Sequence, residues 1–229
     1  MKTIGVLGGL GPQATMDFVA RVHRVSQELI PQHFALGYPP MVVCYYRHAP
    51  MIVEDDMPTY PLQADPRLFE ALLPLRGVAD FLVVPSNTPH EFAAELEEAA
   101  GCPLLNMVDL TIAEVQRRGL KKVGVVGFFD PVFYTVPLGD LGLDVVKPTP
   151  EVQRPVNAAI GAVLEGRNDL ASTQAAIETV AFLRESGVDG IILGCTEIPL
   201  LLGDGADAED LINPAQLLAE AAVRRAIGD

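Results

Sequence analysis

The sequence predicts an α/β fold of two pseudo-symmetric halves, each with a central parallel sheet flanked by helices. Short apolar runs, typical of buried parallel strands, alternate with stretches of helical periodicity. The chain also contains an internal repeat: residues 121–127 mirror residues 2–8 at an offset of 119, and residues 189–195 mirror residues 80–86 at an offset of 109. The repeat predicts two similar domains facing each other across a cleft, where we expect the active site.

In the first half, an apolar run at residues 2–7 predicts a strand, which a glycine-rich turn and a helix follow. The turn, Gly-Gly-Leu-Gly-Pro, lacks the Gly-x-Gly-x-x-Gly spacing of a dinucleotide site. It therefore predicts a plain strand–helix connection, whose backbone N–H groups could hold a small carboxylate. The later expected elements are strands at residues 41–46, 78–84 and 104–107, helices at residues 66–76, 91–100 and 109–118, and a long loop at residues 49–66.

The second half begins with the repeated strand at residues 121–127, and an aromatic turn at residues 128–135 follows it. An apolar run that ends at Leu193 predicts a second buried strand. Asn213 and Pro214 predict the start of a last helix over residues 215–226, because they suit the cap and first positions. We expect this helix to return to the first domain. The predicted domains are residues 1–110 with 214–229, and residues 111–213.

Composition narrows the function classes. The 229 residues carry a formal charge of −14, which argues against nucleic acid or an anionic membrane as partner. No apolar run has the length of a membrane helix, and the first residues lack the form of a signal peptide, so we expect a cytoplasmic protein. The three cysteines, Cys44, Cys102 and Cys195, form no Cys-x-x-Cys pair, so neither a structural zinc site nor a disulfide framework is expected.

The most informative stretch is Gly-Cys-Thr-Glu at residues 194–197, directly after an apolar strand. Ligands of open parallel sheets bind at the carboxyl ends of strands, so Cys195 is the expected reactive thiol. The repeat places Ser86 at the equivalent strand end of the other half. Cys44 lies inside an apolar strand and Cys102 precedes one, so both are expected to be structural.

These motifs resemble the aspartate/glutamate racemase family, whose members work without pyridoxal phosphate. The resemblance covers the whole chain and rests on residues 4–15, on Ser-Asn-Thr-Pro-His at residues 86–90, and on Gly-Cys-Thr-Glu-Ile at residues 194–198. It implies a cofactor-independent racemase or epimerase that inverts the α-carbon of an amino acid, with aspartate and glutamate as the first candidates. It also implies a homodimer. The family usually has a cysteine where this chain has Ser86.

In such racemases one thiolate removes the α-proton and a thiol on the far face donates another. We expect Cys195 to take one role, with its pKa lowered by a helix that starts after residue 195. Ser86 cannot be an equivalent base, because an aliphatic hydroxyl is about as hard to ionise as water, and its pKa lies so far above that of a thiol that the difference is on the order of 10 kcal/mol. Four explanations stay open: an introduced replacement, a one-cysteine racemase, a single-cysteine carbon–carbon lyase resembling arylmalonate decarboxylases, and a catalytically impaired carboxylate-binding homologue.

Further candidates surround the two strand ends. The resemblance and the turn geometry suggest a set of substrate-binding residues: Gly9, Gly11, Thr15, Arg47, Asn87, Thr88, Thr196 and Glu197. Glu197 either orients or deprotonates Cys195, or it only occupies the first turn of a helix. His90 is either a second proton donor or a surface group on a helix, and Ser86 either lines the cleft as a reacting group or caps a helix.

Overall fold

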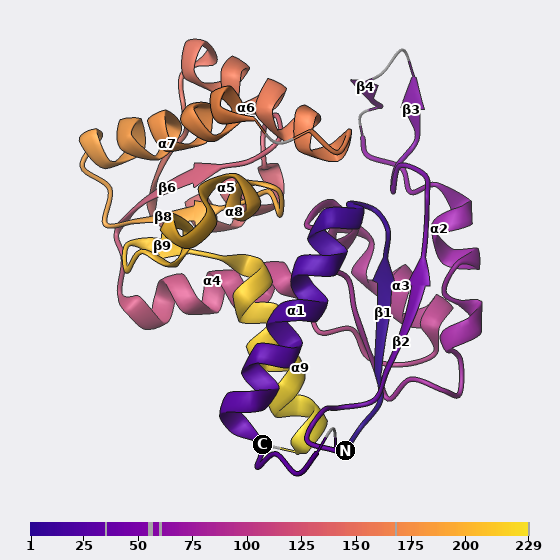
Figure 1. Ribbon diagram of the computed structural model, residues 1–229. Helices are drawn as coiled ribbons and strands as arrows, with labels where there is room; N and C mark the ends of the chain where they lie inside the picture. Colours follow the sequence, from indigo (N-terminus) through magenta and orange to yellow (C-terminus); the bar gives the residue numbers. More distant parts are fainter. Residues whose placement is uncertain (35, 55–56, 60, 168, 229) are drawn as a thin grey trace. The chain divides into compact units, whose positions relative to one another are not determined.

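The computed structural model describes residues 1–34, 36–54, 57–59, 61–167 and 169–228 (Figure 1). The chain divides into two compact units. The first comprises Met1–Met107 and Ala215–Asp229, and the second comprises Val108–Pro214. Each unit contains its own parallel sheet and hydrophobic core. The prediction of an α/β fold with a parallel sheet in each half is therefore confirmed.

The first unit is built on a three-stranded parallel sheet in the order β2-β1-β5. Its elements are β1 (Ile4–Gly8), α1 (Pro12–Leu29), β2 (Met41–Tyr45), β3 (Val53–Glu54), β4 (Met57–Pro58), α2 (Pro66–Glu70), β5 (Phe81–Val83), α3 (Ala93–Ala100) and most of α9 (Pro214–Ile227), with 3-10 turns at Leu73–Leu75 and Thr88–Phe92. A parallel bridge between Leu82 and Leu104 extends the sheet by one further position.

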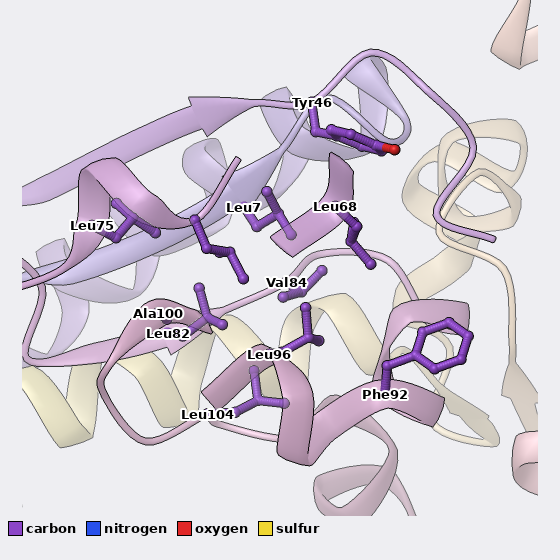
Figure 2. Packing of buried hydrophobic residues seen from close by; sticks show 11 residues of the cluster. Leu7, Tyr46, Leu68, Leu75, Leu82, Val84, Phe92, Leu96, Ala100 and Leu104 are labelled. Atoms are coloured by element: carbon purple, nitrogen blue, oxygen red, sulfur yellow. The ribbon is translucent and has the colours of Figure 1, made fainter. Parts of the chain in front are cut away.

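One core of the first unit lies between its sheet and helices α2 and α3 (Figure 2). Leu7 and Leu82 contribute from the sheet, and Leu68 and Leu96 contribute from the helices. All four are fully buried. Burying one such side chain stabilises the fold by about 1.5–3 kcal/mol, so this layer holds the strand ends firmly in place.

Helix α9 packs within the first unit although it ends the chain. The Ala226 carbonyl accepts a hydrogen bond of 2.8 Å from the Lys2 N–H, and the Arg225 guanidinium lies 5.2 Å from the ring centre of Phe81. The Gln216 side chain in turn accepts a hydrogen bond from Arg21 on α1. The last helix therefore returns to the first sheet, which Figure 1 also shows.

The second unit has a four-stranded parallel sheet in the order β7-β6-β8-β9. Its elements are α4 (Met107–Arg118), β6 (Lys122–Val126), α5 (Val132–Asp140), β7 (Asp144–Val146), α6 (Pro150–Leu164), α7 (Leu170–Glu185), β8 (Gly190–Leu193), α8 (Ile198–Leu202), a 3-10 turn at Gly203–Asp207, and β9 (Leu211–Ile212). Val156 and Ile160 of α6 and Leu183 of α7 pack with Ile191 of the sheet. Helices α6 and α7 thus cover one face.

The internal repeat is reproduced in the hydrogen bonding of the two sheets. Ile4 pairs with Phe81 in the first sheet, and Val123 pairs with Gly190 in the second, which are the same positions at offsets of 119 and 109. An aspartate opens the second strand of each pair. Asp80 accepts a hydrogen bond of 2.6 Å from the Thr3 N–H, and Asp189 accepts one of 2.8 Å from the Lys122 N–H.

Several local expectations need correction. The expected helix at 66–76 ends at Glu70, and a 3-10 turn follows it, because Pro74 interrupts the pattern. The expected strand at 104–107 is reduced to the bridge at Leu104, since α4 already begins at Met107. The expected loop at 49–66 contains a short antiparallel pair, β3 with β4, and residues 55, 56 and 60 of it lie outside the described part.

No helix in the described ranges is both long and apolar enough to span a membrane. Within the same ranges, no group of three or more His, Cys, Asp or Glu side chains is placed to hold a metal ion.

Candidate functional site

Cys195 lies two residues after the end of β8, at the carboxyl edge of the second sheet. Its Sγ atom is 3.0 Å from Oε2 of Glu197, to which the thiol donates a hydrogen bond. The Thr196 hydroxyl donates to the same oxygen over 3.1 Å. The Glu197 residue is only 4% exposed. The strand end therefore joins a thiol to a buried carboxylate, and the threonine orients that carboxylate.

The electrostatics of this group favour the protonated thiol. Burial raises the pKa of Cys195 well above its ordinary value, and the Glu197 carboxylate raises the pKa further. The backbone N–H groups of Glu197 and Phe128 act in the opposite direction and lower the pKa. The expectation of a pKa lowered by a following helix was wrong. Helix α8 has only five residues, and burial together with the adjacent carboxylate outweighs its N-terminal amides.

Ser86 lies three residues after the end of β5, at the carboxyl edge of the first sheet. It is partly exposed, whereas Asn87 is buried. The 3-10 turn at Thr88–Phe92 has Asn87 at its N-cap position, so Ser86 does not cap it. Ser86, Asn87 and Thr88 thus form the connection between strand and turn. Binding of a substrate by Asn87 and Thr88 stays a prediction.

His90 is buried beneath this connection, with 6% of its surface exposed, so the alternative of a surface group was wrong. Its Nε2 atom lies 3.0 Å from the Val84 carbonyl oxygen, which assigns the proton to Nε2. Nδ1 is buried and has no hydrogen-bond partner among the residues that the structure describes. Burial lowers the pKa of His90 to about 4, against a smaller raising effect of the Val84 carbonyl. At neutral pH the side chain is therefore a neutral imidazole.

The glycine-rich turn uses its polar groups internally. The Gly9 N–H donates to the Thr15 hydroxyl over 2.9 Å, and that hydroxyl donates to the Gly11 carbonyl over 2.9 Å. Gly9 has a φ of +83°, and a Cβ there would lie 2.7 Å from the Tyr46 carbonyl oxygen, so the turn requires glycine. The Arg47 guanidinium donates to the Gly9 carbonyl over 2.9 Å. These residues hold the turn in shape, and their contact with a substrate stays a prediction.

The candidate residues fall into two sets. Gly9, Gly11, Thr15, Arg47, Ser86, Asn87 and Thr88 belong to the first unit, and Cys195, Thr196 and Glu197 belong to the second. The remaining cysteines are partly buried and pack against the first core, Cys44 within β2 and Cys102 in the bend before the bridge at Leu104. Burial raises the pKa of both thiols, as expected for structural cysteines.

Sequence reasoning missed the residues around the turn that follows β6. The Phe128 N–H lowers the pKa of Cys195, and Asn157 and Gln153 of α6 contact the turn on either side of Phe128. The repeat contained a usable signal for Phe128, because an offset of 119 aligns it with Gly9. No comparable sequence signal marks Asn157 or Gln153, since their contacts depend on how α6 lies on the sheet.

The chain resembles proteins described as racemases over 96% or more of its length. The broad specificity amino-acid racemase RacX of Bacillus subtilis (strain 168) is 28% identical over 227 residues, which cover 96% of each chain. A candidate Asp/Glu racemase from Yersinia pestis has a crystal structure that matches with a TM-score of 0.72 and 25% identity, over 99% of this chain and 100% of the other. Picrophilus torridus aspartate racemase matches with a TM-score of 0.75 and 20% identity, over 100% of this chain and 95% of the other, which supports the fold alone.

The resemblance first indicated by three short motifs is thus confirmed over the full fold. The sequence pattern of the Asp/Glu/hydantoin racemase family matches residues 7–222. This range includes the strand ends that carry Ser86 and Cys195, and the turns that follow β1 and β6. On this match, the chain belongs to the Asp/Glu/hydantoin racemase family.

Proposed function

We propose that the chain is an isomerase that racemises an amino acid, with Cys195 as the group that exchanges the α-proton and without a cofactor. The observation that carries the proposal is the contact of 3.0 Å between the Cys195 thiol and the buried Glu197 carboxylate, within a motif typical of the family. Membership of the family supports an enzyme of this class.

Glu197 is the proposed proton acceptor that allows Cys195 to form a thiolate despite its raised pKa. A thiol whose pKa is raised by burial cannot act as a base until its proton moves to another group. Glu197 Oε2 accepts that proton across the existing hydrogen bond, and the thiolate then removes the α-proton of the substrate. After removal of the α-proton, the proton on Glu197 passes to solvent. In the opposite direction the Cys195 thiol gives its proton to the carbanion, and the resulting thiolate takes a new proton from solvent through Glu197 Oε2. Protons balance in both directions.

Ser86 occupies the partner position in this proposal. Inversion requires Ser86 and Cys195 to address opposite faces of one α-carbon. A neutral hydroxyl can pass a proton from solvent to a carbanion, whereas it is a poor base in the reverse direction. Because the equilibrium constant of racemisation is one, kcat/KM is equal for the two enantiomers, and the weaker base limits both directions. The backbone N–H groups of Asn87, Thr88 and Thr196 are the proposed holders of the α-carboxylate.

We propose an acidic amino acid, aspartate or glutamate, as the first substrate class to test. Arg47 supports this choice, because it follows β2 at the carboxyl edge of the first sheet and one of its guanidinium nitrogens is anchored on the Gly9 carbonyl. A guanidinium held in this way is suited to a second carboxylate. We also propose a cytoplasmic homodimer built from two domains per chain, which light scattering and limited proteolysis would test.

The deciding experiment is incubation of L- and D-aspartate and L- and D-glutamate with the protein in D₂O. Racemisation predicts inversion together with incorporation of one deuterium at the α-carbon, and loss of both in Cys195→Ala. An active Cys195→Ala variant would refute the role of the thiol. Carbon dioxide released from a disubstituted malonate, with no α-exchange in any amino acid, would instead identify a carbon–carbon lyase. Stabilisation by these ligands without either reaction would identify a binding protein.

A further inference from the structure

The turn that follows β6 lies directly beside Cys195. Strands β6 and β8 pair in register up to Val126 and Leu193, and Gly127 then lies beside Gly194. The N–H of the next residue, Phe128, acts on the Cys195 thiol and lowers its pKa. The Gly194 N–H donates to the Val126 carbonyl over 2.6 Å, and a Cβ on Gly127 would lie 3.3 Å from the Gly194 carbonyl oxygen. The backbone of this turn is therefore packed against the backbone that carries the thiol.

Two side chains of α6 clamp the same turn on both sides of Phe128. Gln153 Nε2 donates to the Gly127 carbonyl over 2.8 Å, and Asn157 Oδ1 accepts a hydrogen bond of 3.1 Å from the Phe129 N–H. The two amides are also joined, because Gln153 Nε2 donates to Asn157 Oδ1 over 2.7 Å. The peptide groups before and after Phe128 are thus both fixed by one helix.

The clamp holds a backbone conformation that the sequence alone disfavours. Phe129 has a φ of +56°, which lies in the left-handed region that bulky residues rarely adopt. Such a conformation costs on the order of 1–3 kcal/mol and persists only where surrounding contacts maintain it. The hydrogen bond from the Phe129 N–H to Asn157 is a contact of this kind.

We propose that Asn157 and Gln153 are positioning residues that hold the Phe128 N–H against Cys195 Sγ and so stabilise the thiolate. A backbone N–H fixed at the place where negative charge develops stabilises an anion without reorganisation during the reaction. This inference rests on the proposed role of Cys195, but the reactivity of the thiol can be measured without turnover.

None of the other charged or titratable groups described below, around Cys195, stabilises its thiolate. Glu197, on the same segment, disfavours the thiolate. On the turn, Asp130 is paired with Lys147 over 2.9 Å. From α5, the ring of Tyr134 lies near Gly194, and burial raises the pKa of that phenol, so it stays neutral. The fixed Phe128 N–H therefore lowers the pKa of Cys195, which burial and the Glu197 carboxylate both raise.

The test is the pH dependence of Cys195 alkylation by iodoacetamide, followed for each cysteine by peptide mass spectrometry. Asn157→Ala and Gln153→Ala are compared with Gln174→Ala, which removes an exposed amide of α7 that bonds Glu178. We expect alkylation of Cys195 at pH 8 to slow about tenfold in the two clamp variants, because a hydrogen bond to a charged group is worth that much or more. We expect no change in Gln174→Ala.

Loss of structure would have the opposite effect, because an unfolded second unit exposes Cys195 and speeds its alkylation. Cys102, in the first unit, serves as the reference within each molecule. An unchanged or faster Cys195 rate in both clamp variants would overturn the positioning role. If the rate falls as expected while the wild-type protein exchanges no α-proton in D₂O, the clamp stands and the proposed racemisation fails.

Discussion

Neutral His90 predicts a specific loss of stability in acid. The imidazole is buried and donates through Nε2 to the Val84 carbonyl, and its pKa in the folded protein is about 4. In the unfolded chain a histidine titrates near 6.5. Between these two values the unfolded state binds more protons than the folded state, so stability is present above the unfolded pKa and is lost as the pH falls toward the folded pKa.

The size of the loss follows from the two pKa values. Proton linkage with 6.5 in the unfolded chain and about 4 in the folded protein removes about 2 kcal/mol between pH 7 and pH 5, and about 3 kcal/mol by pH 4. Because His90 belongs to the Ser-Asn-Thr-Pro-His motif, the segment that loosens is the one that carries Ser86. We therefore expect activity to fall in acid together with the stability of the first unit.

The measurement is urea unfolding at pH 7, 6 and 5, followed by far-ultraviolet circular dichroism because the chain has no tryptophan. His90→Gln keeps a donor for the Val84 carbonyl but does not titrate, so its stability should fall by about 2 kcal/mol less than that of the wild type between pH 7 and pH 5. The exposed His23→Gln variant is the matched control and should follow the wild type. Parallel losses in the wild type and His90→Gln would refute the reasoning.

Three other substitutions test the roles of Glu197, Thr15 and Ser86 one at a time. In Glu197→Gln the Cys195 thiol should be alkylated faster, because the charge that raises its pKa is gone. Racemisation should fall on the order of 10²-fold or more, because the thiol loses its proton acceptor. Slower alkylation would contradict this reasoning. Thr15→Val should lower the free energy of unfolding by about 1–3 kcal/mol in urea titrations, since the buried Gly9 N–H loses its acceptor; an effect below about 0.5 kcal/mol would disagree with it. Ser86→Cys should raise kcat/KM on the order of 10²-fold or more, because a thiol then replaces the weak base that limits both directions, and an unchanged kcat/KM would mean that residue 86 is not the reacting group on that face.

The fold was predictable because two signals reinforced each other. Apolar runs located the central strands, and the repeat aligned Ile4 with Val123 and Asp80 with Asp189, which the two sheets pair in the same register. The short strands escaped prediction. Strand β9 has only two residues, and β7 begins with an aspartate, so neither has an apolar run long enough to stand out from a loop.

The sequence was enough to select candidate residues at the two strand ends, whose role stays a prediction, but not to predict their electrostatics. Position after a strand sufficed to select Cys195 and Ser86. The direction of the Cys195 pKa depends on burial and on the rotamer that brings Glu197 to 3.0 Å, and neither follows from spacing in the sequence. His90 illustrates the same difficulty, because its burial follows from how the 3-10 turn packs.

The difference between the two strand ends extends beyond Ser86 to the turns beside them. The repeat aligns Phe128 with Gly9 at an offset of 119 and Cys195 with Ser86 at an offset of 109. The N–H of Phe128 acts on the thiol, whereas the N–H of Gly9 is already bonded to the Thr15 hydroxyl. A donor engaged in this way is not available to stabilise an anion as the Phe128 N–H does. The two turns thus differ in a way that supports the proposal that Ser86 reacts as a neutral hydroxyl and that the anion forms at Cys195.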